Sequence, residues 1–169
     1  PFAGPYKNCK IIEGNLILKI HEDGNTNDLS NIEHITGDFK IIGISSGFDL
    51  GGFNNLKTIG GDLYIYATGT QSYEGFESLE SIEGNLIIER NEGTGHFKGF
   101  ENLQSIGGDI IYKSNKFTEF AGFSSLTEIG NLVIEIEYSL KHIYGFDSLI
   151  EMKGIHIENI HSIESITGF

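Results

Sequence analysis

The chain contains few basic residues, and this limits the partners that it can bind. Its 169 residues include 11 Lys and Arg against 24 Asp and Glu, which gives a formal net charge of −13. Arg90 is the only arginine, and the lysines are scattered along the sequence. Because binding to phosphates needs clustered Lys and Arg, we expect no nucleic-acid partner and no attraction to anionic membranes.

Cysteine, proline and long apolar runs are also scarce. Cys9 is the single cysteine, so it is either free or paired outside this sequence. No apolar run approaches the ~20 residues of a membrane-spanning helix, so we expect no direct insertion into a membrane. The sequence starts at Pro1 and has no signal peptide, and we interpret it as a mature or trimmed fragment. Two prolines beside 23 glycines are typical of a chain that turns tightly in every repeat.

A repeat of 23 or 24 residues runs through the chain. Its pattern is G-F-x-x-L-x-x-I-x-G-x-L-x-I, with Gly-Phe pairs at 52–53, 75–76, 99–100, 122–123, 145–146 and 168–169. A fixed period of this length predicts a solenoid, in which each coil buries its apolar edge against the next. We expect one domain over residues 1–169, with a leader or cap at 1–13 and coils over 14–169, the last of them incomplete.

The spacing within each repeat predicts β-structure. The L-x-I segment has period two, so it predicts a strand with both apolar residues inward, and the L-x-x-I spacing indicates a corner. Strands in successive coils are expected to stack in parallel and to be joined by loops near 43–51, 67–74, 91–96, 113–119 and 135–139. The repeats at Gly130 and Gly154 each lack one residue. A leucine-rich repeat with one helix per coil is the structural alternative, but no coil has a helical period.

A glycine followed by Asn or Asp precedes most of the predicted strands. Examples are Asn15, Asp38, Asp62, Asn85 and Asp109. Short polar side chains of this kind cap turns. Calcium binding by an acidic ladder is the alternative, but it needs six or more oxygen ligands and clustered carboxylates. We favour turn capping.

The outward positions of the predicted strands carry the candidate binding residues. Down the stack, one outward column contains Tyr, Ile and Val where a solvated sheet would carry polar residues, and contiguous apolar surface is typical of an interface. The alternative is that β-branched residues simply stabilise the strands. The predicted contact residues are Tyr64, Ile87, Ile111 and Val133, with Tyr66 and Lys113 at the polar margin.

Catalytic and cofactor motifs are missing. The six histidines have no metal-ligand spacing, and the repeat places them on different faces. No pair of carboxylates stands out for glycoside cleavage, and no nucleophile motif or phosphate-binding loop is present. We therefore expect no enzymatic activity, no metal and no cofactor.

Residues 163–169 enter a further coil, which predicts either a longer natural chain or self-association through this C-terminal edge.

The first two repeats resemble a known family. The segments 9–18 and 28–37, and the later Leu56-Lys57-Thr58-Ile59-Gly60-Gly61-Asp62-Leu63-Tyr64-Ile65, are similar to receptor L domains, closest to bacterial and fungal cell-surface versions. The resemblance covers roughly residues 9–168. It implies a right-handed β-helix on an extracellular or cell-surface protein. In animal receptors it also implies a cysteine pair, of which Cys9 matches the opening member and nothing matches the closing one.

The resemblance and the outward column together predict a non-enzymatic binding or adhesion module that recognises a protein or glycan at the cell surface. An inert structural spacer within a larger surface protein is the second hypothesis. A carbohydrate-active β-helix enzyme is the third, and the lack of basic residues beside the carboxylates disfavours it.

Overall fold

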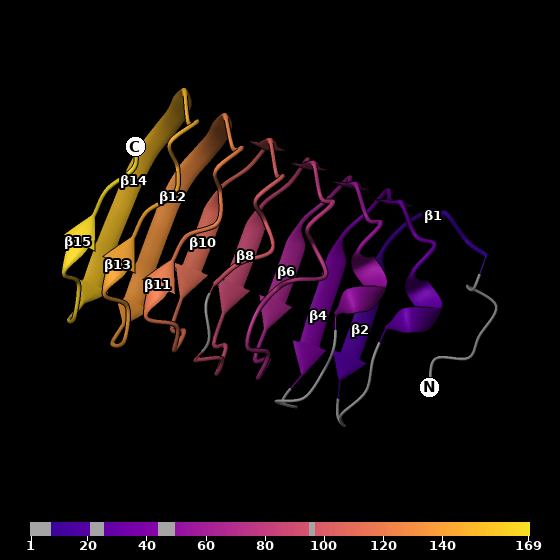
Figure 1. The fold of residues 1–169 in the computed structure, drawn as a ribbon, viewed down its shortest axis with the longest axis horizontal. Helices are drawn as coiled ribbons and strands as arrows, with labels where there is room; N and C mark the ends of the chain where they lie inside the picture. The colour runs from indigo at the N-terminus through magenta and orange to yellow at the C-terminus, as the bar shows by residue number, and fades with distance from the viewer. Residues whose placement is uncertain (1–7, 21–25, 44–49, 95–96) are drawn as a thin grey trace.

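The computed structural model describes residues 8–20, 26–43, 50–94 and 97–169, and within them the chain is an all-β parallel solenoid (Figure 1). One long-strand column runs from the N-terminal to the C-terminal end of the stack, each strand pairing in parallel with the next. Its members are β2 (Leu16–Ile20), β4 (Phe39–Gly43), β6 (Leu63–Tyr66), β8 (Leu86–Glu89), β10 (Ile110–Lys113), β12 (Glu128–Glu137) and β14 (Glu151–Ile160). The predicted fold class is confirmed.

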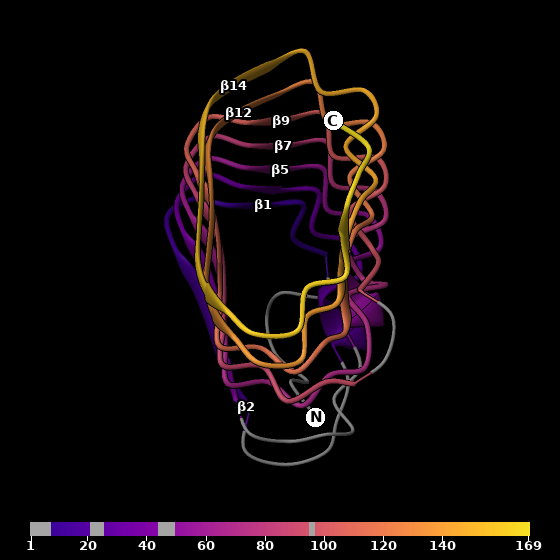
Figure 2. The ribbon, with the colours of Figure 1, turned by 90° about the vertical axis from the view of Figure 1, so that its left-hand side faces the viewer.

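Short strands form a second side of each coil (Figure 2). The L-x-x-I segment, predicted to be a corner, ends in a two-residue strand that pairs with its counterparts in neighbouring coils. These strands are β1 (Ile11–Ile12), β3 (His34–Ile35), β5 (Thr58–Ile59), β7 (Ser81–Ile82) and β9 (Ser105–Ile106). The predicted cap at 1–13 therefore already includes β1, while residues 1–7 lie outside the described residues.

The remaining elements are short. A three-stranded parallel sheet contains β11 (Glu119–Phe120), β13 (His142–Ile143) and β15 (Ser165–Ile166). Two single turns, η1 (Asn27–Leu29) and η2 (Gly51–Phe53), are of the 3₁₀ type, and the described part of the chain contains no α-helix. It therefore has no helix that could cross a membrane. The predicted loops at 43–51 and 91–96 fall partly on residues 44–49 and 95–96, which lie outside the described ranges.

The one-residue deletions explain the two longest strands. In complete repeats, a Gly-Gly, Glu-Gly or Thr-Gly step followed by Asn or Asp separates the short strand from the long one. Gly130 and Gly154 each lie in a repeat that is one residue shorter, and there the strand continues through the corner as β12 and β14. As a result, β12 pairs with both β9 and β10 and joins the two sides into one sheet.

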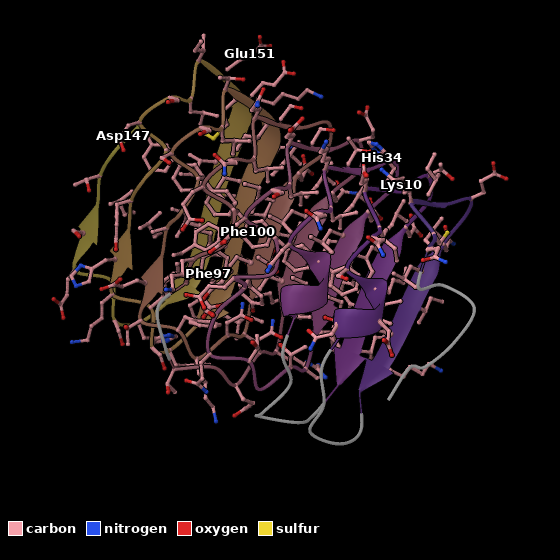
Figure 3. All side chains as sticks on the ribbon, turned by 45° about the vertical axis from the view of Figure 1, so that its right-hand side comes forward. Lys10, His34, Phe97, Phe100, Asp147 and Glu151 are labelled. Atoms are coloured by element: carbon pink, nitrogen blue, oxygen red, sulfur yellow. The ribbon has the colours of Figure 1, made fainter. Side chains whose placement is uncertain are left out.

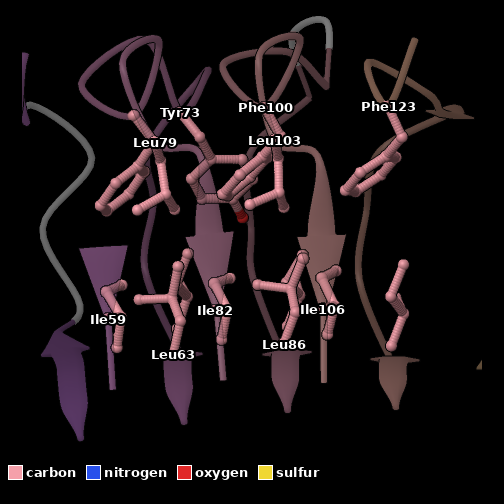
Figure 4. Packing of buried hydrophobic residues seen from close by; sticks show 14 of the residues in the cluster. Ile59, Leu63, Tyr73, Leu79, Ile82, Leu86, Phe100, Leu103, Ile106 and Phe123 are labelled. Carbon is pink, nitrogen blue, oxygen red and sulfur yellow. The ribbon is translucent and has the colours of Figure 1, made fainter. Parts of the chain in front are cut away.

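The core consists of the apolar columns that the repeat predicts. The inward residues Leu63, Ile65, Leu86 and Ile88 have no exposed surface, and Ile82 is 1% exposed. Figure 4 shows Leu63, Ile82 and Leu86 facing Leu79, Phe100 and Leu103 across the interior. In Figure 3, Phe97 and Phe100 lie inside the stack, whereas Lys10, Asp147 and Glu151 lie at its surface. Burial of these columns is the main source of stability in such a solenoid.

The Asn and Asp residues at the corners form a ladder between coils. The Oδ1 of Asn15 accepts a hydrogen bond from the backbone N–H of Asp38 at 2.8 Å, and the Oδ1 of Asp38 accepts one from Asp62 at 3.1 Å. The same bond repeats at Asn85, Asp109 and Asn131. These oxygens therefore satisfy backbone donors at each corner, as the turn-capping interpretation predicts.

In five coils, one residue near the end of the long strand adopts a left-handed backbone conformation. These residues are Ala67, Arg90, Ser114, Ile136 and Asn159, with φ between 53° and 56°. A β-branched residue is strained in this conformation, whereas Asn tolerates it. We therefore expect Ile136→Asn to raise the free energy of unfolding by about 0.5–1 kcal/mol in urea denaturation. The reciprocal Asn159→Ile should lower it, and two shifts of the same sign would contradict this explanation.

Candidate functional site

The outward column predicted from the sequence forms one continuous row across four strands. Parallel pairing places Tyr64 of β6 opposite Ile87 of β8, Ile87 opposite Ile111 of β10, and Ile111 opposite Val133 of β12. Neighbouring strands are ~4.8 Å apart, so these side chains contact one another along the row. All four are half-buried, because each is flanked by its neighbours on the adjacent strands. We call Tyr64, Ile87, Ile111 and Val133 the apolar row.

The two tyrosines at one end of the row are held by neighbouring side chains. The rings of Tyr64 and Tyr66 stack with centroids 5.7 Å apart, and the Tyr64 hydroxyl donates to Glu89 Oε2 at 3.2 Å. Burial, followed by the negative charge of Glu89, raises the pKa of Tyr64 to about 12. The Nη1 of Arg90 donates to the Tyr66 hydroxyl at 3.0 Å, and its guanidinium lies 5.8 Å from the ring centroid. The aromatic end is thus fixed before any partner binds.

Charged residues border the apolar row. Glu89, Lys113 and Glu135 occupy the next outward column, in register with one another. The Nζ of Lys113 lies 3.1 Å from Glu135 Oε2, and both side chains are half-buried. The six predicted residues therefore lie on one sheet face, with Tyr66 and Lys113 on the polar side, and an apolar strip beside ordered charges suits a binding surface.

A second polar ladder lies inside the solenoid and was not predicted from the sequence. The Oδ1 of Asn91 accepts from the backbone N–H and the hydroxyl of Thr68, and Asn115 accepts in the same way from Asn91. Glu137 closes the ladder by accepting from the backbone N–H of Asn115 at 3.0 Å. The signal in the sequence was the spacing of Asn91, Asn115 and Glu137 by 24 and 22 residues, within segments interpreted only as loops.

Glu137 is the acidic residue of this ladder, and its pKa is strongly raised. Its side chain has no exposed surface, and burial raises the pKa of the carboxyl group to about 8 against the hydrogen bonds from Asn115 that lower it. The nearby Tyr112 is also fully buried, and burial followed by the charge of Glu137 raises the pKa of its hydroxyl. These groups are enclosed by the core, so they affect stability and do not form an accessible site.

Two further surface features lie away from the apolar row. A hollow of about 470 Å³ is lined by Asn54, Thr70, Ser72 and Glu74, among others, and contains none of the six predicted residues. At the C-terminal end, Ile155 is 49% exposed and Phe169 51% exposed, although both belong to apolar columns. Self-association through this edge stays a prediction.

One histidine lies beside acidic residues of two strands, a cluster that was not predicted from the sequence as a site. His156 lies in register with Val133, at the end of the apolar row, and its Nε2 is 3.3 Å from Glu158 and 3.9 Å from Glu135. No sequence motif links these residues, because two of them lie on β14 and the third on β12.

Comparison with known proteins identifies the family. The model of the receptor L domain family matches residues 8–68 and 58–137. Searches of curated proteins and of solved structures found no match. The two matched segments overlap and together span residues 8–137 of the 169, which includes every strand that carries the apolar row. The chain therefore belongs to the receptor L domain family.

Proposed function

We propose that this domain binds a protein at a cell surface through the apolar row. Receptor L domains are a non-enzymatic family of ligand-binding modules. The observation that supports this surface is the unbroken register of Tyr64, Ile87, Ile111 and Val133 on the outward face of the sheet. Three of the four side chains in the row are aliphatic, which favours a protein partner over a glycan, because sugars present mainly hydroxyl groups to their binding sites.

The arrangement suits binding without large rearrangement. The strands are fixed by hydrogen bonds to the coils on both sides, and Tyr64 and Tyr66 are already ordered by Glu89 and Arg90. Preorganised aromatic residues lose little side-chain entropy on binding and are frequent binding hot spots. The extracellular location and the adhesive role are part of this proposal.

The double substitution Tyr64→Ser and Ile111→Ser tests the surface. Peptides selected from a phage-displayed random library on the wild-type domain should bind the double variant at least tenfold more weakly, because two contacts on either side of Ile87 are removed. Both side chains are half-buried, so the free energy of unfolding should fall by only about 1–2 kcal/mol in urea denaturation.

The matched control is Glu80→Ser with Gln104→Ser, two exposed positions on the short-strand side. Selected peptides should bind this control as tightly as the wild type. Peptides that bind both double variants equally, or a library that yields no binder, would contradict the proposed surface and favour the spacer hypothesis. Enrichment on a glycan array that depends on Tyr64 would instead identify a carbohydrate ligand.

A further inference from the structure

We propose that Glu135, His156 and Glu158 bind one divalent transition-metal ion of the zinc type on the outward face of the sheet. The three residues offer two carboxylate oxygens and one imidazole nitrogen, all within 4.8 Å of one another. This inference depends on the geometry of these side chains and not on the proposed protein partner.

The strand register brings the three ligands together. Glu135 of β12 is paired in register with Glu158 of β14, and His156 precedes Glu158 by two residues. Residues two apart in a strand point to the same face, so His156 and Glu158 both point outward. The opposite face of β12 is fixed, because Leu132 and Ile134 are fully buried in the core. Backbone pairing therefore holds the three side chains on one patch of sheet.

The distances between the ligand atoms are close to those of a metal site. The Nε2 of His156 lies 3.3 Å from Glu158 Oε2 and 3.9 Å from Glu135 Oε1. Around a tetrahedral zinc ion with bonds of ~2.0–2.1 Å, neighbouring ligand atoms are roughly 3.3–3.5 Å apart. An ion can therefore enter with side-chain shifts below ~1 Å. The side chains of His156 and Glu158 are exposed, so rotation about their χ angles allows such shifts.

Lys113 orients one of the ligands from the neighbouring strand. Its Nζ lies 3.1 Å from Glu135 Oε2, and the Oε1 of the same carboxylate faces His156. A contact of this kind to the second oxygen fixes a ligating carboxylate, as outer-shell partners do at metal sites. The ammonium also places a positive charge near the ion, which lowers affinity for a cation.

The ligand set selects among metals. Imidazole with two carboxylates suits Zn²⁺ and its neighbours in the transition series, whereas Ca²⁺ needs six or more oxygen ligands. Three protein ligands leave a coordination position open. Because His156 is paired with Val133, the site lies at the end of the apolar row.

Isothermal titration calorimetry of the metal-stripped chain with Zn²⁺ tests the site. We expect one equivalent to bind, and no equivalent heat from Ca²⁺ at the same concentrations. His156→Ala and Glu158→Gln should each weaken Zn²⁺ binding at least tenfold, since each removes one of three ligands. The control is His161→Ala, which removes another exposed histidine, stacked on Tyr138 and outside the cluster.

Lys113→Met provides a test in the opposite direction. It removes the positive charge while leaving all three ligands, and Glu135 stays in register with Glu158 through the backbone. We therefore expect the relief of charge repulsion to outweigh the lost contact to Glu135, and Zn²⁺ affinity should rise several-fold. Zinc binding that survives His156→Ala, or that is lost equally in His161→Ala, would overturn the site, as would the absence of a stoichiometric event in the wild type. The double variant Tyr64→Ser and Ile111→Ser keeps all three zinc ligands, so it should bind Zn²⁺ as the wild type does even if it no longer binds peptides. The two proposals can therefore fail separately.

Discussion

Phe100→Ala is expected to lower the free energy of unfolding by about 3–5 kcal/mol, because it empties a site in the middle of the stacked core. The Phe100 ring has no exposed surface. It stacks on Phe76 with centroids 5.5 Å apart and on Phe123 at 5.7 Å, with interplanar angles of 9° and 8°. Removing it takes away contacts to the coils on both sides, which hold each other in place in a solenoid. Urea denaturation followed by circular dichroism measures the change.

The same column supplies a matched control. Phe169 stacks on Phe146 with centroids 5.0 Å apart and an interplanar angle of 8°, but its own surface is 51% exposed. Phe169→Ala removes the same ring and the same type of stacking without leaving an enclosed cavity, so it should cost less than about 1.5 kcal/mol. An equal loss in the two variants would mean that stacking alone, and not burial between coils, gives the column its stability.

The repeat was sufficient to predict the interior of this solenoid. A side chain in a parallel stack has its counterpart one period away, so the period alone identifies the inward column of Leu63, Leu86 and Leu132, and all three are fully buried. It also identified the outward row, because residues between two inward ones must point away. The corner prediction was incomplete, since two adjacent residues per coil, such as Ser81–Ile82, already pair with their neighbours.

Contacts that depend on more than the period could not be predicted. The period places His156 beside Val133 and Glu158 beside Glu135, but it does not show that the Nε2 of His156 comes within 3.3 Å of one carboxylate and 3.9 Å of the other. The burial of Glu137 is a similar case. A Glu in a polar segment is typical of a solvated loop, but the chain turns inward after Ile136 and places the carboxyl group at the end of the Asn ladder.

The internal ladder also shows why polar residues are tolerated in this core. The backbone N–H groups of Thr68, Asn91 and Asn115 each donate to a side chain of the following coil, so none is left unsatisfied. The amide Nδ2 of Asn115 donates in turn to the carbonyl of Ile88 at 3.0 Å. A polar network of this kind is stable when every member is paired, and the protonation of Glu137 is then the variable that remains.

The stability of the domain should therefore fall as the pH rises from about 4.5 to about 8. The pKa of Glu137 is raised from its ordinary value of 4.5 to about 8 in the folded state, so across this interval the folded chain binds a proton that the unfolded chain has released. Stability decreases with pH wherever the folded state holds more protons. The favourable contribution is complete below about pH 4.5 and is lost as the pH passes through 8. At ~1.4 kcal/mol per pKa unit, its size is a few kcal/mol.

Glu137→Gln isolates this contribution from those of the other acids. The Gln Oε1 can accept the hydrogen bonds of Asn115 and cannot ionise, so the variant should be less sensitive to pH, and more stable than the wild type at pH 9. The pKa values of the surface residues Glu33, Glu74 and Glu164 are lowered by their lysine partners, and these three acids act equally in both proteins. Urea denaturation in EDTA at pH 5, 7 and 9 gives the difference in the free energy of unfolding between the wild type and Glu137→Gln. A difference that is the same at all three pH values would show that the Glu137 carboxyl group ionises normally in the folded chain.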